Sequence, residues 1–298
     1  MIDAWRRRRD LIVLNLIVLN MMFAWLSIFS PAASAADTYA SGHYAELPGV
    51  KLWFVDTGGS GPAIVLLHAN TGTSAYWENQ IARFSRAGYR VVAFDRRGWG
   101  KSLAEPATGP QPGTIADDLD ALVDHLKLAK FHLVGVAGGG FAAIDYAAWR
   151  PERLRSLVVA ASTASLADQA MKDFTARIEI AELRKLPAVY REVGASYRGA
   201  DPEGTRRWIE IDAHAQQPGA VNQPLRSPNT FAKLEAMAMP VLVVAADADL
   251  LAPPALMRLW AAHVKHYAWV SIPDAGHAVA WEQPDRFNDA LLGFVRRH

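Results

Sequence analysis

Short apolar runs alternate along the chain with segments in which apolar residues recur at helical spacing. The apolar runs have the length and composition of parallel strands buried on both faces and cover residues 63–67, 90–94, 131–136, 154–160, 240–246 and 267–272. Helical spacing occurs in residues 76–87, 115–128, 138–149, 254–263 and 285–295. Residues 44–47 and 51–56 predict an antiparallel hairpin at one edge. The alternation predicts an α/β fold with a mostly parallel, doubly wound sheet of about eight strands.

Residues 164–230 interrupt this alternation. They show no strand pattern, and their charged and aromatic helical stretches at 171–185, 187–197 and 202–213 lead into a polar segment at 216–229. We therefore predict a helical cap, residues 164–230, inserted after the sixth strand of the sheet. The core would then consist of residues 36–163 and 231–298.

The N-terminal residues have a targeting pattern rather than a folding pattern. A basic stretch, Arg6–Arg9, precedes an apolar segment at residues 11–29, and small residues at Ala33 and Ala35 follow. This order predicts a signal peptide, residues 1–35, and an exported protein that is periplasmic or secreted. The alternative is an uncleaved membrane anchor formed by residues 11–29, which is the one case in which we expect a membrane partner.

Composition narrows the chemistry further. The chain has 298 residues, 51% of them hydrophobic, which excludes a disordered chain. Its 31 Lys and Arg balance 30 Asp and Glu without general clustering, which argues against a nucleic-acid partner. Because there is no cysteine, disulfides, thiol nucleophiles and thiolate zinc sites are excluded.

A glycine-rich turn between a predicted strand and a predicted helix is the first candidate site. Residues 135–139 read Gly-Val-Ala-Gly-Gly, which matches the nucleophile turn G-x-S-x-G except that Ala137 replaces the serine. Glycines are needed there because side chains two positions from the turn centre would collide with neighbouring backbone. Residues 138–143 also fit the dinucleotide-binding pattern G-x-G-x-x-A, with Gly138, Gly140 and Ala143, but that loop needs an acidic residue at the end of the next strand, and residues 158–162 supply none.

Acidic and histidine residues follow later strands at the same expected edge of the sheet. Asp247 and Asp249 come after the strand at 240–246, and His277 lies on the loop after the last strand. A carboxylate on the first loop can orient a histidine on the second. The loop after the strand at 63–67 can supply the backbone N–H of Asn70, which would pair with that of Gly138 to stabilise an oxyanion. We expect His68 to hold this loop in place.

Together these features resemble the α/β-hydrolase fold superfamily, from about Tyr44 to the C-terminus. Residues 94–102 resemble its D-x-R-G-x-G-x-S turn, and residues 275–277 resemble its Gly-His loop. The family-like position of Pro253, four residues after Asp249, favours Asp249 over Asp247 as the acid. The chain departs from the family at Ala69, where a second glycine is common, and at Ala137, where the nucleophile belongs.

The resemblance implies a serine hydrolase that cleaves a small carboxylic ester, lactone or related acyl bond with no cofactor or metal. His277 would be the base, Asp249 would orient it, and Asn70 and Gly138 would form the oxyanion hole. We interpret Ala137 as a deliberate replacement of the nucleophilic serine, which leaves the chain inactive. The alternatives are a natural ligand-binding member of the same fold, chemistry without a side-chain nucleophile, and a parent amidase or carbon–carbon bond hydrolase.

Substrate selection is expected from aromatic residues around the site. The candidates for a substrate-binding rim are Trp77, Trp99, Tyr190, Tyr197, Trp208 and His214. The alternative is that these side chains pack the cap onto the core. Substrate identity and oligomeric state are not indicated by the sequence.

Overall fold

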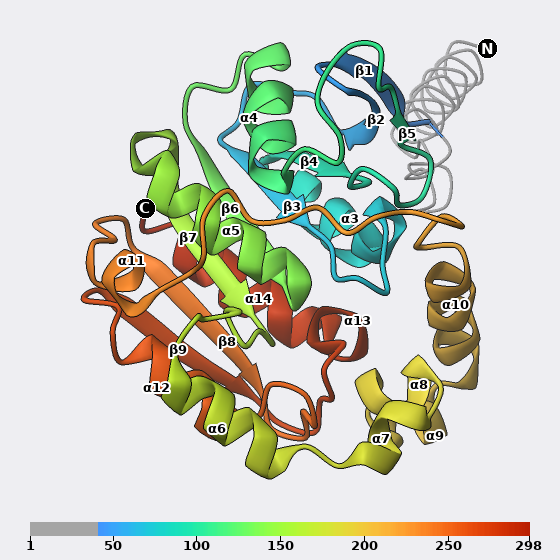
Figure 1. Cartoon of the computed structure of the whole chain (residues 1–298), viewed down its shortest axis with the longest axis vertical. Coiled ribbons are helices and arrows are strands. Elements are labelled where there is room, and N and C mark those ends of the chain that lie inside the picture. The colour runs from blue at the N-terminus through green and yellow to red at the C-terminus, as the bar shows by residue number, and fades with distance from the viewer. Residues whose placement is uncertain (1–40) are drawn as a thin grey trace, which may run out of the picture. The chain divides into compact units, whose positions relative to one another are not determined.

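The computed structural model describes residues 41–298 (Figure 1). The predicted signal peptide, residues 1–35, and the alternative anchor, residues 11–29, lie outside the described residues. In the described part of the chain, no helix combines the length and apolar character needed to cross a membrane.

A single mixed sheet forms the centre of residues 41–298. Its strands are β1 (His43–Leu47), β2 (Val50–Asp56), β3 (Ala63–Leu67), β4 (Arg90–Phe94), β5 (Leu103–Ala104), β6 (Phe131–Val136), β7 (Leu154–Ala160), β8 (Val241–Ala246) and β9 (Tyr267–Ile272). The spatial order is β1-β2-β4-β3-β6-β7-β8-β9, with the two-residue strand β5 paired to β2. The pairs β1–β2 and β2–β4 are antiparallel, and all pairs from β4 to β9 are parallel. The predicted fold class is therefore confirmed.

Helices cover both faces of the sheet (Figure 1). Those of the core are α3 (Glu78–Arg86), α4 (Ile115–His125), α5 (Gly138–Trp149), α11 (Phe231–Glu235), α12 (Pro254–Ala261), α13 (Val279–Glu282) and α14 (Pro284–Val295), with short 3₁₀ helices η1 (Ser74–Trp77) and η2 (Pro151–Arg153). Apolar side chains of α4, α5 and α12 fill one face, and those of α3, α13 and α14 fill the other. Successive residues of β3 alternate between the two clusters, as a strand buried on both faces requires.

The site region is determined by the order of the central strands. Strand β3 lies between β4 and β6, so the chain leaves β3 toward one side of the sheet and later returns on the other. In the β3–β6 pair, Leu67 is level with Gly135, so the loops after these strands begin side by side. Such a reversal leaves a crevice at the carboxyl ends of the strands, where ligands bind in open α/β sheets.

The predicted cap, residues 164–230, lies in the chain between β7 and β8. Its helices are α6 (Gln169–Ile178), α7 (Ala181–Lys185), α8 (Ala188–Glu192), α9 (Ala195–Ala200) and α10 (Pro202–Ala213). Four cap residues, Val189, Val193, Trp208 and Ile211, join the hydrophobic cluster on the α3–α14 face. The cap is thereby packed onto the core through α8 and α10.

Two helices expected in the cap are each broken in two. The stretch 171–185 is interrupted at Glu179 and Ile180, which have extended backbone. The stretch 187–197 is interrupted at Val193 and Gly194, also extended, and the N–H of Gly194 donates to the Glu282 carboxylate of the core at 3.0 Å. The second break is thus stabilised by a contact outside the cap, which helical spacing alone does not reveal.

Candidate active site

Ala137 forms the turn between β6 and α5. Its backbone has φ 48° and ψ −117°, a conformation that strains any residue carrying a Cβ. The turn is close-packed: a Cβ on Gly135 would lie 2.5 Å from the Gly139 oxygen, and one on Gly139 would lie 2.3 Å from the Leu67 oxygen. The Ser162 hydroxyl donates to the Ala137 carbonyl at 2.8 Å. The strained turn characteristic of a nucleophile is therefore present, although its side chain is a methyl group.

His277 and Asp249 form a buried hydrogen-bonded pair. The imidazole Nδ1 lies 2.8 Å from Asp249 Oδ2, while Oδ1 accepts from the backbone N–H groups of Leu251 and Ala252 at 2.8 and 2.9 Å. Burial opposes ionisation of Asp249, yet the contact with His277 and the two N–H groups lower the pKa of this carboxyl below its usual value. Burial likewise opposes protonation of His277, but the Asp249 carboxylate, helped by Glu192 and Glu282, raises the pKa of the imidazole.

Asp247, the alternative acid, lies elsewhere. Its side chain is exposed and accepts a hydrogen bond from the Ser271 hydroxyl on β9. The geometry therefore couples His277 to Asp249. With Nδ1 donating to Asp249, Nε2 is the ring nitrogen left to exchange a proton with a ligand.

Two backbone N–H groups are available beside Ala137. Gly138 is the first residue of α5, so its N–H has no acceptor within the helix. Within residues 41–298, neither the N–H of Gly138 nor that of Asn70 donates a hydrogen bond. An ideal Cβ built on Gly138 would lie 2.7 Å from Asn70 Oδ1, so the two residues adjoin.

Hydrogen bonds from three buried side chains, His68, Trp99 and Arg96, hold the loop that carries Asn70. His68 donates from Nδ1 to the Ala69 oxygen at 2.7 Å and accepts at Nε2 from the Arg96 N–H at 3.0 Å. Burial and the nearby Arg96 charge lower the pKa of His68 well below its usual value, so the ring is neutral and structural. The Trp99 indole donates to the Asn70 carbonyl at 2.7 Å, and the Arg96 guanidinium, stacked on the Trp99 ring, donates to Asn70 Oδ1 at 3.0 Å.

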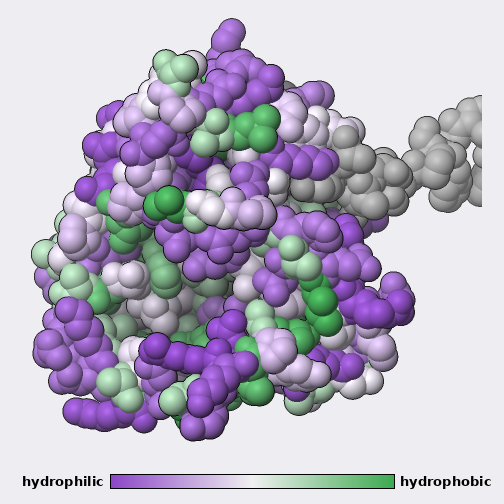
Figure 2. Space-filling model, turned by 45° about the vertical axis from the view of Figure 1, so that its right-hand side comes forward, coloured by the Kyte–Doolittle hydropathy of each residue, from purple (hydrophilic) through white to green (hydrophobic). Residues whose placement is uncertain are grey.

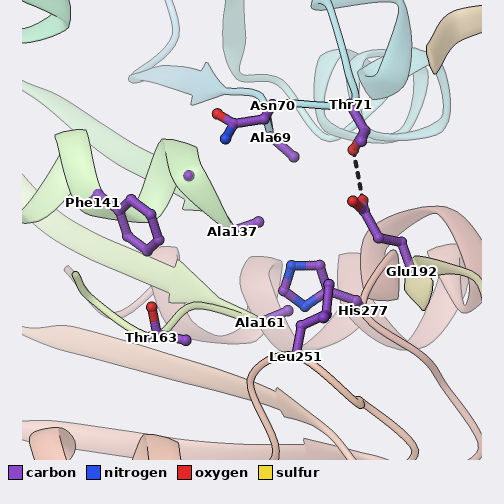
Figure 3. A pocket seen from close by; sticks show the side chains of 11 residues that line it. Ala69, Asn70, Thr71, Ala137, Phe141, Ala161, Thr163, Glu192, Leu251 and His277 are labelled. Carbon is purple, nitrogen blue, oxygen red and sulfur yellow. Dashed lines mark hydrogen bonds between the residues drawn. The ribbon is translucent and has the colours of Figure 1, made fainter. Parts of the chain in front are cut away.

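These groups surround one cavity of ≈ 210 Å³ (Figure 3). Ala137, Gly138, Asn70 and His277 line it, and the imidazole of His277 faces the Ala137 methyl group in Figure 3. Phe141 and Leu251 supply apolar walls. The cavity has room for a small acyl group, with N–H donors and a histidine–carboxylate pair at one wall. In the described part of the chain, no group of three or more acidic or histidine side chains is placed to hold a metal ion.

The aromatic rim expected from the sequence does not line this cavity. Trp77 and Trp208 are fully buried in the core, and Trp99 lies beneath the Asn70 loop. Tyr197 donates to Asp201 within the cap, Tyr190 is exposed with Arg198 over its ring, and His214 donates from Nδ1 to the Glu210 carbonyl. None of these six residues lines the cavity around Ala137, and a role for them in substrate binding stays a prediction.

Two acidic residues near the cavity were missed by sequence reasoning. Glu192, at the end of α8, lines the cavity and accepts a hydrogen bond from the Thr71 hydroxyl at 2.6 Å (Figure 3). Glu282 is buried and accepts from the N–H groups of Gly276 and Gly194 at 2.8 and 3.0 Å. Burial raises the pKa of Glu282 although these N–H groups oppose the change. A Glu within a charged helix has no distinctive spacing, so the cap's fold was needed to place Glu192.

Some apolar side chains of the described residues are exposed at the surface. On the face drawn in Figure 2, hydrophobic side chains gather along a hollow, and the surrounding surface is mainly hydrophilic. Exposed apolar side chains of the cap include Ile180, Leu186 and Tyr190, and Leu250 is exposed on the loop that follows Asp249.

Comparison with known proteins gives relatives with hydrolase activities in their names. The chain is 32% identical over 248 residues to a candidate carbamate hydrolase, RutD, of Agrobacterium fabrum, covering 80% of this chain and 95% of that protein. It is 27% identical over 279 residues to the 2-hydroxy-6-oxononadienedioate/2-hydroxy-6-oxononatrienedioate hydrolase of Burkholderia vietnamiensis, with 83% and 92% covered. A thermophilic esterase from Thermogutta terrifontis has a similar structure, with a TM-score of 0.72, 26% identity, and 86% of this chain and 98% of that chain covered.

The family assignment follows from the length of the match. The model of the alpha/beta hydrolase family matches residues 64–290, which include the Ala137 turn, Asp249 and His277. The family and the named relatives indicate hydrolase activity. With strand order, site geometry and sequence in agreement, the chain belongs to the alpha/beta hydrolase family.

Proposed function

We propose that the chain has the framework of a hydrolase for a small carboxylic ester, lactone or related acyl bond, and lacks the nucleophile that a serine would supply at position 137. One observation carries the proposal. The strained backbone of Ala137, two adjoining unpaired N–H groups and the His277–Asp249 pair meet at one cavity. An alanine cannot attack a carbonyl, but the groups that would assist a serine at this position adjoin it, and this supports the proposal.

In the serine form, the hydroxyl at position 137 attacks the acyl carbon and gives its proton to His277 Nε2. Asp249 keeps the imidazole in the required tautomer and stabilises its protonated form. The Asn70 and Gly138 N–H groups bind the oxygen that becomes negative in the tetrahedral intermediate. His277 then protonates the departing alcohol, and the same groups activate water to release the acid.

In the alanine form, we expect the protein to bind its ligand but not to hydrolyse it. Serine and alanine differ by one oxygen atom, so the cavity keeps its shape and its N–H donors. A hydroxyl that reacts in the transition state contributes little to binding of the unreacted substrate. We therefore expect this chain to bind a small acyl ligand without serine-type turnover. The alternative is a natural ligand-binding member of the same fold that has no catalytic activity, and Ala137 itself favours it.

The experiment is to introduce the serine. We expect Ala137→Ser to raise kcat on short p-nitrophenyl esters by about 10⁴-fold or more, by the reverse of the loss seen when subtilisin loses its serine. Adding His277→Ala to the serine variant is expected to abolish the gain.

The matched control is Ala161→Ser, which places a hydroxyl on another alanine lining the same cavity. It should gain no activity, because it lies outside the strained turn. If the Ala137→Ser protein binds small acyl ligands but hydrolyses no ester, lactone or amide, the ligand-binding reading replaces the proposal.

A further inference from the structure

The cap places one carboxylate in the wall of the cavity. Glu192 is the last residue of α8, and its Oε2 accepts from Thr71, the residue after Asn70. Its backbone oxygen also accepts from the N–H of Ala278, the residue after His277, at 2.9 Å. Glu192 is therefore fixed relative to both the N–H donor at Asn70 and the imidazole (Figure 3).

The second oxygen of this carboxylate has no partner in the described part of the chain. Across residues 41–298, Glu192 forms no ion pair, and Oε1 accepts no hydrogen bond. The adjacent Arg191 donates instead to the Leu186 carbonyl. Arg96, the cation nearest the Asn70 loop, is bound to the Asn70 side chain and does not line the cavity.

Glu192 is the one acidic side chain among the described residues that line the cavity. Glu192 and His277 are the ionisable residues among those described that line it, and the buried carboxylates of Asp249 and Glu282 lie behind the imidazole. The influence of the Glu192 charge reaches its neighbours: it contributes to the raised pKa of His277, and, after burial, to raising the pKa of Asp212 to about 6. A half-buried charge is screened less by solvent and salt than one at the surface.

We propose that Glu192 determines substrate specificity and selects small acyl compounds whose free end carries an ammonium group or another strong hydrogen-bond donor. The unpaired Oε1 accepts from that donor while the acyl carbonyl occupies the N–H groups of Asn70 and Gly138. A substrate ending in a carboxylate is rejected, because its charge would be brought beside Glu192 with no cation in the cavity wall to offset it. The reaction on such a substrate rests on the proposed function, whereas the charge preference in binding does not.

The first test measures binding to the protein as it exists. Three methyl esters of similar length are used in calorimetric titrations: methyl 4-aminobutanoate (cationic), methyl pentanoate (neutral) and monomethyl succinate (anionic). We expect the cationic ester to bind about 10-fold more tightly than the anionic one, the size of one charged hydrogen bond. Equal affinities for the three esters would overturn the proposal.

Two variants test whether the preference for the cationic ester depends on Glu192. Glu192→Gln keeps an oxygen for Thr71 and removes the charge, so the cationic preference should fall to within about twofold, with binding of the neutral ester unchanged. Glu203→Gln is the matched control, since Glu203 is an exposed cap glutamate paired with Arg206. A preference that survives in Glu192→Gln, or is lost equally in Glu203→Gln, contradicts the assignment to Glu192.

A second measurement separates this inference from the proposed function. In the Ala137→Ser background, kcat/KM for hydrolysis of the same three methyl esters, followed by methanol release, should follow the same order, through KM rather than kcat. Charge-selective binding without any turnover would remove the proposed function and leave the inference standing. Turnover with no charge preference would support the proposed function and overturn the inference about Glu192.

Discussion

The two sides of the cavity are built in different ways. On the core side, Ala137, Asn70 and Asp249 follow the fully buried strands β6, β3 and β8, and His277 follows β9, which is mostly half-buried or exposed. The loops of these residues are held by hydrogen bonds. On the cap side, α7, α8 and α9 have five or six residues each and expose apolar side chains to solvent. Isolated helices of this length are not stable in water, so they depend on their contacts with the core.

This difference suggests separate roles for the two sides: the core carries the groups assigned to the reaction, and the cap contributes to the choice of ligand. The residues to which the proposed function assigns the chemistry lie on loops that follow strands of the sheet, whereas the short helix α8 contributes Glu192 to the cavity wall. Changes in the cap can therefore alter which molecule enters the cavity. Changes at Glu192 or Gly194 also act on the loop that carries His277, because Glu192 binds the Ala278 N–H and Gly194 shares the Glu282 carboxylate with Gly276. Variants that distinguish the two sides test this view.

The largest effect is expected at the acid on the core side. In the Ala137→Ser background, Asp249→Asn should lower kcat by about 10⁴-fold, because an amide no longer holds the imidazole in the productive tautomer. Asp247→Asn is the matched change two residues away, and its exposed position predicts less than about a threefold effect on kcat. Equal losses in the two variants would show that neither carboxylate orients the base.

The next effect is on stability, and one Gly→Ala substitution on each side of the cavity tests it. Gly139→Ala places a methyl group against the Leu67 backbone and should lower the free energy of unfolding by about 2 kcal/mol or more. Gly199→Ala, in α9 of the cap, meets no atom within 4 Å and should raise it by up to about 1 kcal/mol through helix propensity. Urea unfolding measures both, and a Gly139→Ala protein as stable as the parent would contradict the close packing of the turn.

The smallest effect concerns pH. His277 accepts a proton in its neutral form, so activity of the Ala137→Ser enzyme should rise as pH increases through the raised pKa of this residue. Glu192→Gln removes one of the charges that raise this pKa, so the acidic limb of kcat/KM should move to lower pH by a fraction of a unit. Glu203→Gln should leave the limb in place. A shift to higher pH in Glu192→Gln would contradict the electrostatic link across the cavity.

The core was predictable from sequence because its signals are local. Apolar runs gave β3, β4, β6, β7 and β9 with their observed bounds. For β3 and β6 the reason is that a strand buried on both faces needs no polar positions, whereas β9 is an edge strand that is mostly half-buried or exposed. The glycines around Ala137 and the positions of Asp249 and His277 after strands were enough to bring these residues to one edge. The choice between Asp247 and Asp249 came from the family-like spacing to Pro253, and in the structure Asp249 is the residue that contacts His277.

The cap was less predictable because its structure depends on distant contacts. The break at Gly194 is held by Glu282, nearly ninety residues later in the chain. The aromatic residues were assigned to substrate because their spacing is the same whether they face a cavity or the interior, and burial in the structure shows the latter for Trp77 and Trp208. Glu192 gave no signal because a single glutamate in a charged helix is ordinary in sequence.

The buried carboxylate of Glu282 connects the cap to the loop that carries His277. One of its oxygens accepts both from Gly194 in the cap and from Gly276, the residue before His277, and its other oxygen has no partner among the described residues. A substitution that displaces Gly194 removes one of the N–H groups that hold this carboxylate, so its effect should extend from the cap to the histidine loop.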